Sequence, residues 1–404
     1  MFRTWKSIVG PFVVLAATVV ARPPAQPVAQ QQLTFNLPNH ASYVGMVERT
    51  GQPVAGSHSW SGPLATGDGR FTLVEYENQR FVRIHMASKV LEVAGTGAAL
   101  REINSDTVPE CGVRPPSAPV ISSALLGDPC AGVANAVAPD AGRSNALCKT
   151  GGANLVNLAG LGPQIDALVV YTPTARGSVG GDVSMRGLIL LAVDETNQAF
   201  ARSNVNATLR IAMQPPPAGI NAQPRPCIGA IGYTDSGVVF TDLAELILGS
   251  GTGAQVRALR DRCNADVAVM IVGNGDFGGQ ACIMEHLSAA FAPYAYAVVL
   301  ASSASGNYAF AHEIGHLMGA GHDDRHDGNW LGMCSYSKGW HFRDHIGLGH
   351  KSIMAYRPGF KSLNYSDPSV RYDIGGDVTG AWGANGASNA RTLRISADTV
   401  SRFR

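Results

Sequence analysis

Between Ser42 and Ile103, apolar and polar residues alternate along short stretches that turn-forming residues separate. The segments RFTLVEY (70–76) and RFVRIHMA (80–87) show the alternation clearly, and TGDG (66–69) is one of the separating turns. A period of two is typical of strands that bury one face, and glycine-rich tetrapeptides are typical of tight turns. The pattern predicts an antiparallel β-meander of about sixty residues.

A different pattern begins near Gln164. The run IDALVVYTP (165–173) is almost continuously apolar, as in a strand that is buried on both faces, and residues 184–205 carry apolar positions at helical spacing. Further strands are predicted at 207–214, 265–273 and 296–302, and further helices at 240–250, 254–263 and 389–403. Strands that alternate with helices indicate an α/β (α+β) layer structure with a mixed sheet. The region after Asp324 is rich in glycine and is predicted to be irregular until the last helix.

The N-terminus has the pattern of a secretory signal peptide over residues 1–21. Arg3 and Lys6 precede a short apolar run, and Ala21 suits the last position before a cleavage site. The alternative is an uncleaved N-terminal anchor. We expect a β-rich domain over 22–106, a connector rich in Ala, Gly, Pro and Ser over 107–163, and a second domain over 164–404.

Composition excludes some classes of partner. The 404 residues carry a formal net charge of +1, so bulk electrostatics give no reason to expect nucleic acid or an anionic membrane as a partner. No apolar run after the N-terminal one is long enough for a transmembrane helix. We therefore expect a secreted monomer, extracellular or periplasmic, with no stable membrane association.

The segment NYAFAHEIGHLMGAGHDD (307–324) concentrates candidate chemistry. On a helix, His312 and His316 are four residues apart and share one face, where two imidazoles can bind one Zn²⁺. Gly319 can end the helix in a left-handed conformation, and the turn can bring His322 back as a third ligand. Three protein ligands leave one position open, which is typical of a catalytic zinc site, and Glu313 lies where a general base is needed.

HEIGHLMGAGHD resembles the zinc signature of the metzincin metallopeptidases, and Asp323 after the third histidine is similar to the reprolysin and adamalysin branch. SIMAY (352–356) resembles the Met-turn of that family, which implies that Met354 forms an apolar floor under the histidines. Tyr356 has the offset of a tyrosine that binds zinc or the oxyanion in astacins and serralysins. Typical reprolysins lack it, so the chain combines features of several branches.

Residues 164–404 most resemble the bacterial peptidyl-Asp metalloendopeptidases, through ALVVYTP, ETNQAF, the zinc motif and the C-terminal segment. This resemblance implies protein or peptide substrates and cleavage on the amino side of Asp or Glu. A carboxylate-binding pocket needs a cation, because burying an unpaired carboxylate is costly. Arg357 and Lys361 follow the Met-turn and are the first candidates, with Arg343 and Lys351 as alternatives.

The seven cysteines are an odd number, so at least one lies outside intramolecular disulfides. ECGV, which contains Cys111, resembles the cysteine switch of matrixin and adamalysin propeptides, so the β-rich domain is predicted to be a prodomain. A thiolate is a good zinc ligand and would keep the site inactive. The alternative is that Cys111 is an ordinary disulfide partner. We expect Cys130 to pair with Cys148, and the four cysteines after them to form two bridges within 164–404.

Together these features predict a secreted zinc endopeptidase that is made as a zymogen, with one catalytic Zn²⁺, Glu313 as general base and Tyr356 at the oxyanion. Nothing in the sequence decides whether it binds structural Ca²⁺. Two other classes remain open: a catalytically silent zinc-binding adhesion or inhibitor module, and a zinc amidohydrolase that acts on small amides.

Overall fold

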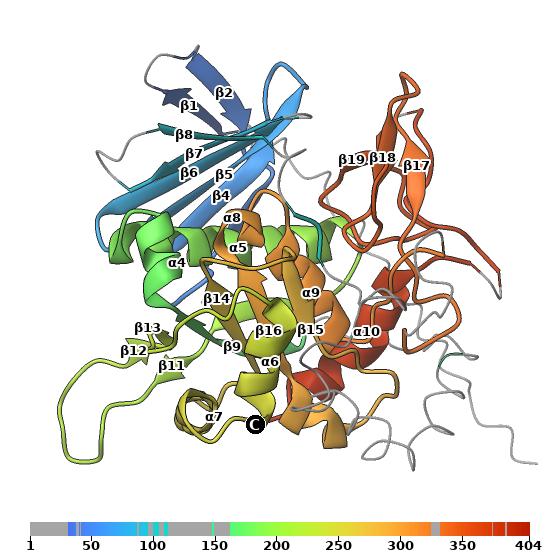
Figure 1. Cartoon of the computed structure of the whole chain (residues 1–404). Helices are drawn as coiled ribbons and strands as arrows, with labels where there is room; N and C mark the ends of the chain where they lie inside the picture. The colour runs from blue at the N-terminus through green and yellow to red at the C-terminus, as the bar shows by residue number, and fades with distance from the viewer. Residues whose placement is uncertain are drawn as a thin grey trace, which may run out of the picture.

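The computed structural model places an N-terminal antiparallel sheet across a helix of a larger α/β body, with the C-terminal residues along the right flank of that body in this view (Figure 1). The structure describes residues 31–37, 40, 42–86, 89–95, 100–104, 109–111, 148, 162–324, 332–373, 375–383 and 386–404. The predicted signal peptide and most of the predicted connector lie outside these residues.

The N-terminal sheet is a simple meander. Its strands are β3 (Arg49–Gly51), β4 (His58–Pro63), β5 (Gly69–Tyr76), β6 (Gln79–Met86), β7 (Lys89–Ala94) and β8 (Leu100–Asn104). Each strand pairs antiparallel with the next, which confirms the meander that the alternating pattern predicts. A separate antiparallel pair, β1 (Gln32–Asn36) with β2 (Ser42–Met46), precedes it.

The central sheet has the strand order β10-β9-β14-β16-β15, and β13 pairs with a second part of β9. Its strands are β9 (Gln164–Tyr171), β10 (Thr208–Ile211), β13 (Ile228–Ala230), β14 (Val267–Val272), β15 (Gly279–Ala281) and β16 (Tyr296–Leu300). Only β15, at the edge, runs antiparallel to its neighbour. Every residue of β14 and β16 is buried, as expected for parallel strands covered on both faces. The predicted mixed sheet is confirmed.

The helices of this body are α4 (Pro173–Ser178), α5 (Asp182–Arg202), α6 (Val239–Leu248), α7 (Thr252–Arg262), α8 (Ala301–Ala304), α9 (Ala309–Leu317), α10 (Asn389–Val400) and the 3₁₀ helix η2 (Ala289–Tyr294). The four long helices predicted from apolar spacing correspond to α5, α6, α7 and α10. Helix α9 packs against β15, β16 and α5, so the rigid core positions the HEIGH segment. In the described part of the chain, no helix is both long enough and apolar enough to cross a lipid bilayer.

Helix α5 lies under the meander, and its polar residues are buried there (Figure 1). Asp194 accepts a hydrogen bond from Ser59 at 2.6 Å, and Gln198 donates to Thr72 at 2.8 Å. Arg83, whose side chain is 1% exposed, pairs with Glu92 in the meander and lies 3.7 Å from Glu195. These buried contacts hold the meander against α5.

The C-terminal part contains a small sheet where the sequence predicts irregular structure. Its strands are β17 (His341–Arg343), β18 (Gly349–Lys351) and β19 (Phe360–Lys361), and β18 pairs antiparallel with β17 and parallel with β19. These strands are short, so apolar and polar residues do not alternate over a stretch long enough to predict strands from the sequence. Another two-stranded pair joins β11 (Met213–Gln214) and β12 (Arg225–Pro226).

The disulfides correct two expectations: the pairing of Cys148 with Cys130, and the two bridges among the last four cysteines, because Cys334 leaves that set to pair with Cys148. Cys148 is bonded to Cys334 and not to Cys130, so the end of the connector is tied to the C-terminal domain. Cys227 is bonded to Cys263, and Cys282 is also disulfide-bonded. Cys130 lies outside the described residues. Among the described cysteines, Cys111 alone is free.

Candidate active site

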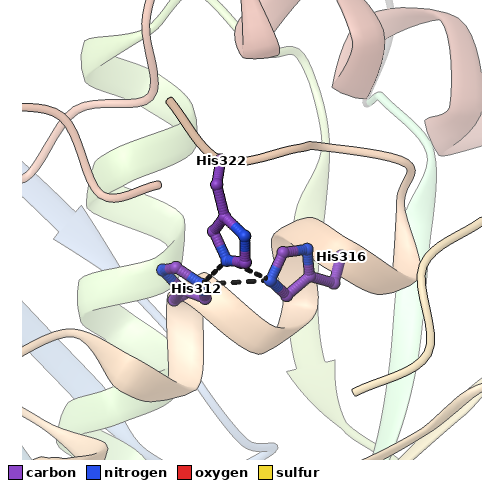
Figure 2. A group of neighbouring side chains, drawn as sticks. All are labelled: His312, His316 and His322. Carbon is purple, nitrogen blue, oxygen red and sulfur yellow. Dashed lines mark hydrogen bonds between the residues drawn. The ribbon is translucent and has the colours of Figure 1, made fainter. Parts of the chain in front are cut away.

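Helix α9 carries His312, Glu313 and His316, and every residue from Ala309 to Leu317 is buried. The helix ends at Leu317, and Gly319 follows with φ of +90°, a conformation that a residue with a side chain rarely adopts. A Cβ at Gly319 would also come within 2.9 Å of the Cβ of Met333. The turn at Gly319 reverses the chain, so His322 returns over the helix to face the two helical histidines (Figure 2).

The three imidazole rings converge through their Nε2 atoms (Figure 2). The Nε2 of His312 lies 3.0 Å from that of His316 and 3.0 Å from that of His322, and the last two are 2.9 Å apart. All three residues are buried. The sequence prediction that these three side chains meet is therefore confirmed by the geometry.

The protonation of these rings tests whether the cluster fits a metal ion. Nδ1 of His312 lies 2.9 Å from the carbonyl oxygen of Ile353, and Nδ1 of His316 lies 2.9 Å from that of Ala320. A carbonyl only accepts, so both Nδ1 atoms carry the proton and both Nε2 atoms are bare. Burial and the neighbouring imidazoles hold the pKa of both rings well below the usual histidine value, which keeps them neutral. Bare nitrogens this close repel each other unless a cation binds them, so the residues fit Zn²⁺.

The segment that resembles the Met-turn packs against the helix that carries His312 and His316. Met354 is fully buried, and a Cβ added to Gly315 would lie 2.9 Å from its sulfur, which places Met354 directly against helix α9. Asp323 holds the segment in place, because its Oδ2 accepts the backbone N–H of Tyr356 at 2.7 Å. Met354 thus lies where the resemblance to the Met-turn implies, as an apolar contact and not as a ligand.

Glu313 is completely buried beside the cluster. Neither of its carboxylate oxygens accepts a hydrogen bond from the residues that the structure describes. Burial raises its pKa to about 8, although the Cys111 thiol and the charge of Lys361 oppose the shift. A Cβ at Gly279 would lie 2.6 Å from Oε1, so the carboxylate packs directly against the backbone of the edge strand β15.

Tyr356 contacts the same cluster. Its hydroxyl oxygen lies 3.0 Å from Nε2 of His322, and the ring is 9% exposed. This phenol is therefore adjacent to the point where the three histidines converge. Its position allows either of the roles that the sequence suggests, donation to an oxyanion or contact with the metal.

Cys111 reaches the site from outside the C-terminal domain. It is buried and free, and its sulfur, a nitrogen of His312 and a carboxylate oxygen of Glu313 all lie within 4.8 Å of one another. Burial raises the pKa of the thiol, and the nearby Glu313 carboxylate adds to the shift. The backbone that precedes Cys111 is anchored, because Gly278 donates to the carbonyl of Glu110 at 2.7 Å and Asn307 donates to that of Pro109 at 3.3 Å.

The predicted specificity cations lie near this segment. Arg357 has a half-exposed side chain with Nε 3.7 Å from Oε1 of Glu110, and Lys361 donates to the carbonyl of Asn307 at 3.1 Å. Lys351, an alternative in the sequence, pairs directly with Glu110. Arg343 is exposed on β17. Sequence reasoning missed Glu110, although its position directly before Cys111 was the available signal.

The family model and the relatives that match this chain are all metallopeptidases. Residues 163–366 match the model of the family Reprolysin_5, described as metallo-peptidase family M12. A peptidyl-Asp metalloendopeptidase of Stenotrophomonas maltophilia (strain R551-3) is 34% identical over 59% of this chain and 52% of its own length. One from Xanthomonas campestris pv. campestris is 32% identical over the same shares. The chain thus spans about half the length of these curated relatives.

A solved structure is also similar. Metalloproteinase-II from Bacteroides fragilis is 11% identical, with a TM-score of 0.38, and the match covers 75% of this chain and 86% of that one.

Proposed function

The chain belongs to metallo-peptidase family M12, and from this premise we propose that it is a zinc-dependent endopeptidase that acts on proteins or peptides. One observation carries the proposal: three histidine Nε2 atoms lie within 3.0 Å of one another beside the completely buried carboxylate of Glu313. The histidines would hold the ion, and Glu313 is left free to move a proton.

The mechanism follows from these positions. When bound by His312, His316 and His322, Zn²⁺ supplies a Lewis acid that polarises the scissile carbonyl and lowers the pKa of water. Glu313 accepts a proton from the attacking water and passes it to the leaving amine. The Tyr356 hydroxyl donates to the carbonyl oxygen as negative charge develops on it. A silent binding module would not need a base at the position of Glu313, which supports the catalytic alternative.

We further propose that the enzyme prefers to cleave on the amino side of Asp, or of Glu. The relatives named peptidyl-Asp metalloendopeptidases support this preference, as do the cations Arg357 and Lys361 beside the site. The edge strand β15 supports a peptide rather than a small amide, because a backbone segment already binds at its end through the hydrogen bond from Gly278 to Glu110.

We also propose that the protein is a secreted zymogen. Cys111 beside the histidines supports a thiol that blocks the site, and the disulfides support an oxidising compartment such as the periplasm or the extracellular space. The meander is then the prodomain, removed or displaced on activation.

The test of this function is a digest of a denatured protein mixture, with the new N-termini sequenced, with and without a chelator. We expect termini that begin mainly with Asp, their loss with the chelator and their return when Zn²⁺ is added. An activated, zinc-loaded protein that generates no new termini would refute the endopeptidase. New termini without an acidic preference would refute only the specificity.

Tyr356→Phe should lower kcat by roughly 10- to 100-fold, at or below the loss typical of one oxyanion donor. The substitution removes the hydroxyl and keeps the ring, so the zinc content should not change. Turnover and bound zinc per chain are measured together. Tyr294→Phe, on η2, is the matched control. Loss of zinc from the Tyr356→Phe protein would show that the phenol holds the metal and is not only an oxyanion donor.

A further inference from the structure

Resting on the proposed preference for acidic residues, we propose that Lys351 is the main cation of the subsite that receives the substrate's acidic side chain. We propose also that Glu110 occupies this subsite in the precursor as an internal substitute for that side chain. The subsite is defined here by Lys351, Arg357 and Lys361, and the blocking segment by Pro109, Glu110 and Cys111.

The contacts of Glu110 are those expected of a substrate carboxylate bound in the subsite. Its Oε1 pairs with the ammonium of Lys351 and lies 3.7 Å from Nε of Arg357, and its Oε2 accepts the backbone N–H of Arg357 at 3.2 Å. Burial alone would raise the pKa of Glu110, but Lys351 outweighs it through charge and hydrogen bonding, helped by Lys361, and the pKa falls below its usual value. The subsite therefore stabilises a carboxylate in its ionised form.

Lys351 depends on that carboxylate. Its side chain is 4% exposed, and within the described residues Glu110 is the only acidic group within ion-pair distance of it. A buried ammonium without a counter-charge is costly. In the precursor the Glu110 carboxylate offsets this cost, and an acidic side chain of a substrate would do the same.

The strand pairing brings a second cation to the same place. β18 and β19 pair in parallel with Lys351 opposite Lys361, and opposite residues on neighbouring strands project from the same face. Like charges directly opposite each other destabilise a sheet, so this pair favours an anion between or beside its ammonium groups. Arg357, half-exposed and more distant, contributes mainly through its backbone N–H.

The blocking segment has the placement of a peptide in the site. The carbonyl of Glu110 accepts the N–H of Gly278, next to β15, and the following residue, Cys111, reaches His312 and Glu313. A Cβ at Gly278 would lie 2.5 Å from the carbonyl oxygen of Pro109, so glycine is what allows this close approach. Glu110 is thus bound through its backbone beside the start of β15, and its side chain enters the basic subsite.

The first arm of the test measures the subsite in the activated enzyme. Two fluorogenic peptides differ only in Asp or Asn after the cut, and kcat/KM is compared for wild type, Lys351→Met and Lys338→Met. Lys338 is the matched control, because its ammonium pairs with Asp324 instead. We expect Lys351→Met to lower the Asp/Asn ratio at least about 10-fold, since it removes a charge-assisted hydrogen bond, and Lys338→Met to leave it unchanged.

The outcomes separate this proposal from the proposed function. A wild-type enzyme without an Asp/Asn preference would refute the proposed specificity, and the subsite with it. A wild-type preference that persists in Lys351→Met would overturn only the role of Lys351. Equal losses on both peptides would show a merely structural lysine and would also overturn that role.

The second arm measures the blocking segment without catalysis. In full-length protein that carries Glu313→Gln, the alkylation rate of Cys111 by iodoacetamide is compared with and without Glu110→Gln. We expect Glu110→Gln to speed alkylation of Cys111 about 10-fold, because the segment loses its anchor. Lys351→Met should have a similar effect, since it removes the other partner of the same ion pair. The double variant should therefore be alkylated little faster than either single variant. Unchanged alkylation in Glu110→Gln protein would overturn the role of Glu110, and circular dichroism melting checks that each variant is folded.

Discussion

Glu313→Gln should reduce peptidase turnover by about 10²- to 10⁴-fold, the usual contribution of a general base, while the zinc stays bound. The three histidine ligands are untouched, and glutamine has nearly the shape of glutamate, so the completely buried site keeps its packing. What is lost is the acceptor for the proton of the attacking water. Turnover and zinc per chain are measured on the same activated sample.

Two variants frame this result. Glu245→Gln, on α6, is the matched control and should retain turnover. His322→Ala should instead weaken metal binding itself, because it removes one of three ligands. A zinc-loaded Glu313→Gln enzyme with wild-type turnover would contradict the mechanism.

The histidine cluster was predictable because its geometry is local. Two histidines four residues apart on a helix meet regardless of the rest of the fold, and Gly319 ends the helix by its own conformational freedom. The meander and the alternating strands and helices were predictable for a similar reason, since burial repeats with the period of each element.

Contacts between residues that are far apart in the sequence were not predictable. The bond between Cys148 and Cys334 spans 186 residues, and no spacing rule selects it. The proposed basic subsite depends on the pairing of β18 with β19 and on the contact of Glu110 with Gly278, which is distant in sequence. The partners of the buried Glu195 also come from distant segments, because Ser305 donates to it at 2.8 Å and Arg83 of the meander lies 3.7 Å away.

In the proposed zymogen, latency would depend on how a tethered thiol competes for the metal site. Cys111 is free, buried and adjacent to His312, and Glu110 anchors the residue before it. A tethered group acts at an effective concentration of about millimolar, so even a thiolate with about micromolar affinity would leave roughly one site in a thousand open. Serine has nearly the size of cysteine, but its hydroxyl stays protonated and is a poor zinc ligand.

Full-length Cys111→Ser precursor should therefore be active on a peptide substrate as soon as it is purified, on the order of 100-fold above the parent precursor or more, and should process itself faster. Initial rates and the time course of self-cleavage on denaturing gels measure the two effects. Cys111→Ser combined with Glu313→Gln is the control, and it should show neither activity nor self-cleavage although the site is open. A Cys111→Ser precursor as silent as its parent would show that the thiol does not maintain latency, and the Glu110 contact and the meander would then have to block the site without it.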